Sequence, residues 1–194
     1  MVALLESDGF ETVDLGLIPD NEEAIETTVR EGVAKCDALV TTGGVSMGDY
    51  DYVKVVLNKM GDMRWMQIAI KPAKPFAFGV VQGIPIFGLP GNPVSSMVSY
   101  LLLAKPALNK MMGKKSILPK VFRGIAADDF RRRADGKTHF VRSFLHEEKG
   151  ATLLSPIGKQ GSHQLSGMAE ANTLSIIPDG DGVTNGNPIE YFRF

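Results

Sequence analysis

A glycine-rich segment between residues 38 and 52, ALVTTGGVSMGDYDY, holds the first residues that could bind a ligand. Because its glycines lack a Cβ atom, the backbone can adopt positive φ angles and bring several N–H groups close to an anion. A serine hydroxyl adds a further donor. These residues are Gly43, Gly44, Ser46 and Gly48. The segment predicts a phosphate-binding loop, although an ordinary turn between a strand and a helix, with aspartates capping the helix, would have the same composition.

Two carboxylates, Asp49 and Asp51, follow in the same segment. A carboxylate repels a phosphate directly, so a site that uses both groups needs a divalent cation between them. Mg²⁺ prefers hard oxygen ligands of this kind. The sequence therefore predicts that a phosphate-binding loop at this place would work together with Mg²⁺.

A second candidate is the lysine- and proline-rich stretch 71–75, KPAKP. Proline fixes φ, so the prolines hold the side chains of Lys71 and Lys74 on a stiff loop. Two ammonium groups held in this way favour the binding of a small oxyanion. A solvent-exposed proline turn that carries solubilising lysines is the alternative.

A third candidate is the stretch 89–96, LPGNPVSS, which leads into a long apolar stripe at helical spacing. Asn92 is a favourable N-cap, and Pro93 suits the first helical position. The unpaired N–H groups of this helix start, together with Ser95 and Ser96, would form a second anion site. A proline-rich helix start without any ligand fits the same residues.

Alternating strand and helix patterns must position these stretches. Residues 38–40 form an apolar run typical of a buried parallel strand, and periodicity predicts helices at 21–36 and 52–60. Further expected elements are a helix end at 1–5, strands at 12–18, 64–70, 76–81 and 84–89, a tight turn at Gln82-Gly83, and a helix from Pro93 that is kinked at Pro106. A helix end that feeds a strand indicates an earlier strand of the same unit upstream, so we expect this chain to be the C-terminal piece of a longer protein.

The second part of the chain is β-rich and follows a basic linker at 113–119. Its strand candidates are separated by Asp-Gly, Lys-Gly and Asn-Gly turns, and a small barrel or sandwich is the natural way to pack them. They are residues 120–127, 138–147, 151–154, 172–177 and 189–194. We interpret the run Arg131-Arg132-Arg133 as a solvent-exposed charge cluster on a loop. The histidines lack metal-ligand spacing and are interpreted as non-ligands.

Composition restricts the classes of function. The chain has 194 residues, 44% of them apolar, which is enough for one large or two small domains. Its formal net charge of −1 does not favour binding to nucleic acid or to an anionic membrane. Cys36 is its single cysteine, which excludes an internal disulfide and favours a reducing compartment. The sequence contains no Walker A motif, no GxGxxG fingerprint after a predicted strand, and no signature of covalent hydrolysis.

Four stretches, TTGGVSMGDYDY, IAIKPAKPFAFG, GLPGNPVSS and GKQGSHQLSGM, in this order and at these spacings, closely resemble the MoeA family of molybdopterin molybdenumtransferases, shared with the gephyrin E domain. The resemblance implies an α/β fold: a MogA-like three-layer α/β domain with a mostly parallel sheet at residues 1–115, followed by a small C-terminal β-barrel at residues 116–194. Family members have two further N-terminal subdomains and an earlier strand that ends in Gly-Asp-Glu. The resemblance therefore implies a piece that begins inside the first helix of the MogA-like domain.

The activity that the resemblance implies is insertion of molybdate into adenylylated molybdopterin, assisted by Mg²⁺ and releasing AMP. The single cysteine makes the cytoplasm the default location. The resemblance also implies a homodimer whose pocket is completed by N-terminal subdomains, so the chain by itself is expected to be a poor catalyst. A MogA-type adenylyltransferase is an expected partner, whereas nucleic acid and membranes are not. The alternatives are molybdopterin adenylyltransferase activity, or a non-catalytic scaffold or binding module of the gephyrin type.

The same motifs imply the site residues. Asp20, Asp51 and Lys71 match catalytic positions, and Asp51 would also hold the metal. The implied substrate-binding residues are Gly43, Gly44, Ser46, Gly48, Lys74, Pro90, Gly91, Asn92, Pro93, Arg142 and Ser162. The sequence departs from the family at Gln67, where some members have lysine, and at Ala73, which replaces a common glycine. A positive φ at Ala73 would be strained.

Overall fold

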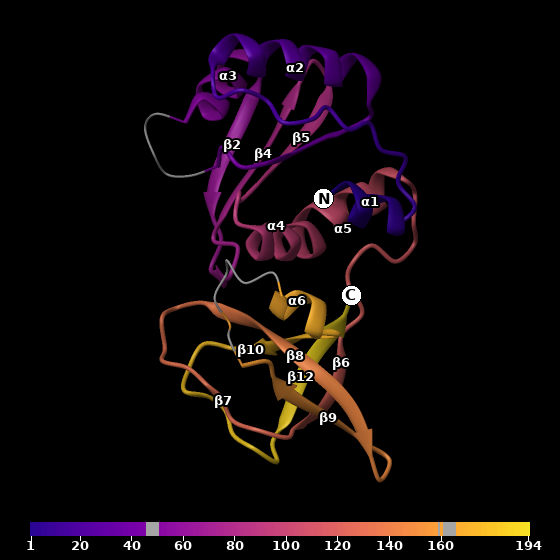
Figure 1. Cartoon of the computed structure of the whole chain (residues 1–194), viewed down its shortest axis with the longest axis vertical. Helices are drawn as coiled ribbons and strands as arrows, with labels where there is room; N and C mark the ends of the chain where they lie inside the picture. Colours follow the sequence, from indigo (N-terminus) through magenta and orange to yellow (C-terminus); the bar gives the residue numbers. More distant parts are fainter. Residues whose placement is uncertain (46–50, 159, 161–165) are drawn as a thin grey trace. The chain divides into compact units, whose positions relative to one another are not determined.

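The computed structural model of this chain describes residues 1–45, 51–158, 160 and 166–194. These residues form two compact units. The first unit comprises residues 1–67 and 75–92, and the second comprises residues 68–74 and 93–194 (Figure 1). The lysine-rich stretch and the glycine-rich loop therefore belong to different units.

The sheet of the first unit is mixed. Its described strands are β1 (Leu39–Thr42), β2 (Asp62–Gln67), β4 (Pro75–Val81) and β5 (Ile84–Leu89), in the order β1-β5-β4-β2. β1 and β5 are parallel, whereas β4 is antiparallel to both of its neighbours. β4 and β5 form a hairpin through Gln82 and Gly83, which have φ angles of 51° and 86°. The expectation of a mostly parallel sheet is therefore wrong for the described strands, because a two-residue hairpin requires antiparallel pairing.

Helices α2 (Glu22–Lys35) and α3 (Tyr52–Met60) lie next to this sheet (Figure 1). Their apolar side chains form a common core with those of the strands. The side-chain oxygen of Asn21 accepts a hydrogen bond from the N–H of Ala24 at 2.9 Å and starts α2, and α3 ends at Gly61. The shared core consists of Ile25, Val29, Val33, Leu39, Val56, Leu57, Val81 and Ile86. Both helices agree with the bounds that the sequence periodicity predicts.

Of the two predictions for the N-terminal residues, one is confirmed and one is wrong. α1 (Val2–Ser7) is the expected helix end. No strand forms in the described segment 12–18, where Gly16 has a φ of +78° and Leu17 is fully exposed. A positive φ interrupts the extended path that a strand needs, and an exposed leucine has no facing layer to pack on.

The second unit contains the predicted barrel. Its described strands are β6 (Phe122–Ala126), β8 (Thr138–Glu148), β9 (Ala151–Pro156), β10 (Thr173–Ile177) and β12 (Pro188–Arg193). In the described residues these five strands run in the order β10-β12-β6-β9-β8, and β8 pairs back with β10 to close the barrel. All five coincide with predicted strands. The short elements β7 (Phe130–Arg131), β11 (Gly182–Val183) and α6 (Ser166–Glu170) were not expected.

The second unit also contains a long helix and a short added strand. The helix consists of α4 (Pro93–Ser99), the π-helical segment η1 (Tyr100–Ala104) and α5 (Lys105–Met111). The change to π geometry comes just before Pro106, which has no N–H to donate to the preceding turn. β3 (Ile70–Lys71) pairs with the start of β8, beyond the residues of β8 that pair with β9. Among the described helices, none combines the length and apolar character needed to cross a bilayer.

Candidate functional site

Two of the predicted anion-binding loops meet at one edge of the first unit. β1 and β5 are parallel neighbours, with Thr42 opposite Leu89, so the segments that follow them emerge side by side. The N–H of Gly43 donates to the carbonyl of Leu89 at 2.9 Å, and a Cβ atom built on Gly91 would lie 3.4 Å from the Cα of Gly43. Open α/β sheets commonly bind ligands at the carboxyl ends of parallel strands. Gly43 and Gly91 are therefore neighbours at this edge of the sheet.

The glycine-rich loop is in contact with the start of α3. Gly44 has a φ of +70°, and a Cβ atom built on it would overlap the side chain of Val53. The N–H of Val53 in turn donates to Oδ1 of Asp51 at 3.2 Å. Asp51 is therefore the N-cap of α3, which is the structural role that the sequence left open beside the metal-binding one.

Asp20 and Pro90 are further predicted site residues of the first unit. Asp20 is exposed in the turn before α2, and within the described part of the chain no hydrogen bond or ion pair involves its carboxylate. Pro90 is buried at the end of β5, next to Gly91. Ser46 and Gly48 lie outside the described residues.

Lys71 and Lys74 are exposed on a closed loop of the second unit. The N–H of Ile68 donates to the carbonyl of Lys74 at 2.7 Å and closes the loop. Between the lysines, Ala73 has a φ of +78° and 3% exposure, so the strain expected for an alanine at this position is present. In the residues that the structure describes, neither lysine amine forms an ion pair. Both charges are therefore available to an anion.

Lys71 also lines a pocket of about 660 Å³ in the second unit. This volume suits a small molecule. Its other charged or titratable lining residues are Arg131, Arg132, Arg133, His139, Asp129 and Asp135. Arg131 is paired with Asp129, and Arg132 with Asp135. Lys71 and Arg133 are then the lining cations that form no ion pair among the described residues, and their charges favour an anionic ligand.

Arg142 lies on β8 and is 2% exposed. Burial lowers the pKa of its guanidinium group, although an arginine stays charged at neutral pH. Its backbone N–H donates to Oε1 of Gln160 at 3.1 Å, and Nε2 of Gln160 donates back to the carbonyl of Arg142 at 2.9 Å. Gln160 also lines the pocket that contains Lys71, so it connects the Arg142 backbone to that pocket. Ser162 lies outside the described residues.

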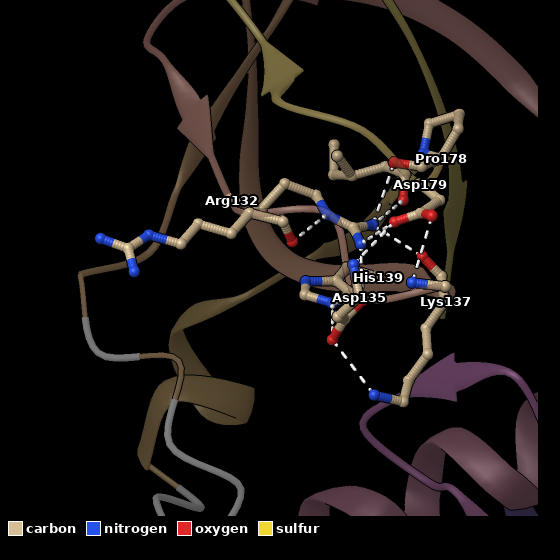
Figure 2. A network of polar contacts seen from close by, with 9 residues as sticks. Arg132, Asp135, Lys137, His139, Pro178 and Asp179 are labelled. Atoms are coloured by element: carbon tan, nitrogen blue, oxygen red, sulfur yellow. Dashed lines mark hydrogen bonds and ion pairs between the residues drawn. The ribbon is translucent and has the colours of Figure 1, made fainter.

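The interpretation of residues 131–133 as an exposed charge cluster is wrong for Arg132. Its side chain is 3% exposed, and its Nη2 atom lies 2.7 Å from a carboxylate oxygen of Asp135 and 2.7 Å from one of Asp179 (Figure 2). Arg131 and Arg133 remain exposed. No local pattern distinguishes the middle arginine from its neighbours, because its burial depends on chain segments far away in the sequence.

The carboxylates around Arg132 are held in the ionised form. Burial opposes ionisation of Asp135, but hydrogen bonds from His139 and Lys137 outweigh it and lower the pKa of Asp135 to about 2. The backbone N–H of Asp135 donates to Asp179 and lowers the pKa of that carboxyl as well. The sequence interpretation missed Asp135 and Asp179, which stand in ordinary turn contexts.

A metal centre built wholly from protein side chains is not present in the described residues, since no three His, Cys, Asp or Glu side chains gather there. Asp51 could hold a metal with oxygen ligands from a bound substrate, which is the usual arrangement for Mg²⁺. Asp49, the other carboxylate of that segment, lies outside the described residues.

Comparison with known proteins identifies the family. Residues 1–110 match the family described as "Probable molybdopterin binding domain", and residues 123–194 match "MoeA C-terminal region (domain IV)". Relatives named "Molybdopterin molybdenumtransferase" come from Haemophilus influenzae, 39% identical over 176 residues, and Bacillus subtilis, 30% identical over 178 residues. These matches cover 90% and 91% of the chain, which spans 43% and 41% of the two relatives, less than half of their length.

A solved structure supports the same assignment. The crystal structure of the molybdopterin biosynthesis MoeA protein from Pyrococcus horikosii has a TM-score of 0.80 and 25% sequence identity, and it matches 99% of this chain over 46% of its own. The resemblance predicted from the four sequence motifs is thereby confirmed. The chain belongs to the MoeA family, with a probable molybdopterin binding domain followed by a MoeA C-terminal region.

Proposed function

We propose that this chain supplies the metal-insertion site of a molybdopterin molybdenumtransferase. The reaction is insertion of molybdate into adenylylated molybdopterin, assisted by Mg²⁺, with release of AMP. The observation that carries the proposal is the contact between Gly43 and Gly91, which brings two loops rich in N–H donors to the carboxyl ends of the parallel strands β1 and β5. The names of the relatives support the same activity.

The loops of the first unit would bind the phosphate-bearing part of the substrate. Backbone N–H groups at Gly43, Gly44 and the 90–92 loop donate to phosphate oxygens, with Ser46 and Gly48 extending the first loop. Asp51 caps α3 with one carboxylate oxygen, so its other oxygen would hold Mg²⁺ against the phosphate. Asp20 would be a second acidic residue of the active site, as its motif position implies.

The second unit would supply positive charge for molybdate, which carries two negative charges. Lys71 and Lys74 are exposed on a loop without ion-pair partners among the described residues. Arg142 and Ser162 are the further substrate-binding residues that the motifs imply in this part of the chain. The dithiolene sulfurs of the pterin bind molybdenum, so the protein needs no cysteine for this step. Its contribution is to orient both substrates and to offset their charge in the transition state.

The proposal includes the finer organisation that the family implies. We assign residues 1–115 to a MogA-like three-layer domain and residues 116–194 to the barrel domain, in a homodimer. A MogA-type adenylyltransferase would supply the adenylylated substrate. The chain by itself should bind substrates and turn over poorly, because the pocket is completed by further segments of the family's longer proteins.

Measurement of AMP released from adenylylated molybdopterin after addition of molybdate tests the proposal. AMP release should require both molybdate and Mg²⁺, and Asp51→Asn should reduce it. The experiment needs the chain in a protein as long as its relatives, with the chain alone measured beside it. Consumption of ATP with molybdopterin, in place of AMP release, would overturn the proposal in favour of an adenylyltransferase.

A further inference from the structure

The strand that carries Lys71 is attached to the first residues of β8. Ile70 lies opposite Thr138 and Lys71 lies opposite His139 in the parallel pairing of β3 with β8. The N–H of Thr138 also donates to the carbonyl of Ala69 at 2.9 Å. On the other edge of β8, His139 lies opposite Ile177 of β10. The start of β8 therefore determines where the Lys71 backbone lies.

Arg132 ties this start of β8 to the end of β10. One of its terminal nitrogens, Nη1, donates to the carbonyl of Lys137 at 2.7 Å and to the carbonyls of Ile177 and Pro178 at 3.2 and 2.9 Å (Figure 2). Lys137 directly precedes β8, and Ile177 is the last residue of β10. A single planar guanidinium group thus joins the two strands at the end where β3 is attached.

The carboxylates bound to Arg132 extend the same connection to His139. Asp135 contacts Nε2 of His139 with its two oxygens at 3.1 and 3.2 Å, and Lys137 with one oxygen at 3.2 Å (Figure 2). Asp179 accepts hydrogen bonds from the backbone N–H groups of Asp135 and Gly136, at 3.0 and 3.1 Å. These bonds fix the turn that leads into β8.

Arg132 itself has no hydrogen-bond donor left for a ligand. A guanidinium group carries five N–H donors. In addition to the contacts above, its Nε donates to the carbonyl of Arg133 at 3.4 Å, and Nη2 donates to both Asp135 and Asp179. Its charge is matched by these two carboxylates. Although Arg132 lines the pocket beside Lys71, its contacts are structural ones within the protein.

We propose that Arg132 is a positioning residue for Lys71, acting through the Asp135–His139 contact and the pairing of β3 with β8. The network holds the register that presents the Lys71 amine to an anion in the pocket. This inference rests on the proposed function, because it assigns molybdate binding to Lys71.

A double-mutant cycle on the whole chain tests the inference. Molybdate affinity is measured by calorimetry for wild type, Arg132→Lys, Lys71→Ala and the double variant. Lysine keeps the positive charge of Arg132 but lacks the planar guanidinium group that donates to several acceptors at once. We expect Arg132→Lys to weaken binding about fivefold in the wild-type background. It should have no effect in the Lys71→Ala background, because that background lacks the amine that Arg132 positions. Arg123→Gln, which removes the exposed Arg123–Glu190 ion pair of the same barrel, is the control and should bind normally.

The outcomes separate the inference from the proposed function. A loss of affinity that persists in the Lys71→Ala background, or unchanged affinity of Arg132→Lys, would overturn the positioning role. If Arg132→Lys does not fold, Asp179→Asn gives the same test, since it removes one of the charges that hold Arg132. Normal binding by Lys71→Ala would instead contradict the molybdate role of Lys71.

A second readout tests positioning without molybdate. The rate at which an amine-reactive acylating reagent modifies Lys71 is measured by mass spectrometry, with exposed Lys110 as internal reference. Arg132→Lys should change the Lys71 rate at least twofold relative to Lys110, because the amine moves with β3. An unchanged ratio would overturn the positioning role whatever Lys71 binds.

Discussion

Gly44 packs against Val53 at the start of α3, so closely that a Cβ atom on Gly44 would overlap the Val53 side chain. Gly44→Ala should therefore lower the free energy of unfolding by more than about 2 kcal/mol, through backbone strain at its φ of +70° and through overlap. The matched control is Gly83→Ala, since Gly83 has a φ of +86° and nothing within 4 Å of a built Cβ. The control should lose about 1 kcal/mol from strain alone. Equal losses in chemical denaturation would contradict a tight contact between this loop and α3.

Ala73, between the two lysines, tests how strain and chain entropy balance. Ala73→Gly relieves a positive φ that costs about 1–2 kcal/mol, but it loses a buried methyl group worth about 0.8 kcal/mol and gives the unfolded chain entropy worth about 0.4–1 kcal/mol. These terms nearly cancel, so the free energy of unfolding should change by less than about 1 kcal/mol. Ala73→Val, with a β-branched side chain at the same φ of +78°, should lose more than about 2 kcal/mol. Thermal or urea unfolding of both variants checks this; a large gain in Ala73→Gly would mean that the strain is greater than expected.

The barrel should lose stability at acid pH through Asp135. Its pKa is about 2 in the folded protein, whereas an unfolded aspartate has a pKa near 3.9. The folded state therefore binds fewer protons between these values, so the stabilisation is fully present above about pH 4 and is lost as pH falls through about 2. Urea unfolding between pH 5 and 2 measures the slope.

Asp135→Asn should have a shallower loss of stability between pH 5 and 2 than wild type, because it has no carboxyl group to protonate there. Asp181→Asn, at an exposed aspartate outside the network around Arg132, is the control and should keep the wild-type slope. A wild-type slope in Asp135→Asn would show that other groups cause the acid sensitivity.

Local sequence signals were sufficient for most elements of the fold. Asn21 and Gly61 mark helix ends that the structure reproduces, and the turn-bounded strands of the barrel follow their sequence patterns. Loops that follow adjacent parallel strands emerge at the same edge of a sheet. The proximity of Gly43 and Gly91 is therefore of a kind that the sequence pattern can predict. The expected strand at 12–18 failed because apolar alternation carries no information on whether a partner strand exists.

The network around Arg132 could not be predicted from local sequence. Residues 131–133 are identical in type, and the side chain that becomes buried is selected by the carbonyls of Ile177 and Pro178, which approach only when β10 pairs with β8. The mixed sheet has a related cause. The Gln82-Gly83 turn makes β4 and β5 antiparallel, whereas the directions of β1 and β2 depend on which strands they pair with, and local sequence does not specify those partners.

Asp51 has a capping role in the structure and a proposed metal-binding role, and two substitutions can separate them. Asn caps helices about as well as Asp, whereas Ala removes the side-chain acceptor and costs about 1 kcal/mol. Asp51→Asn should therefore keep the wild-type free energy of unfolding, since its amide oxygen can still accept from the N–H of Val53, while Asp51→Ala should lose about 1 kcal/mol. If Asp51 also holds Mg²⁺, both variants should lose Mg²⁺-dependent AMP release to a similar extent, because neither has a carboxylate. Full activity in Asp51→Asn, together with a loss in Asp51→Ala that follows its stability, would mean that Asp51 acts as a helix cap alone.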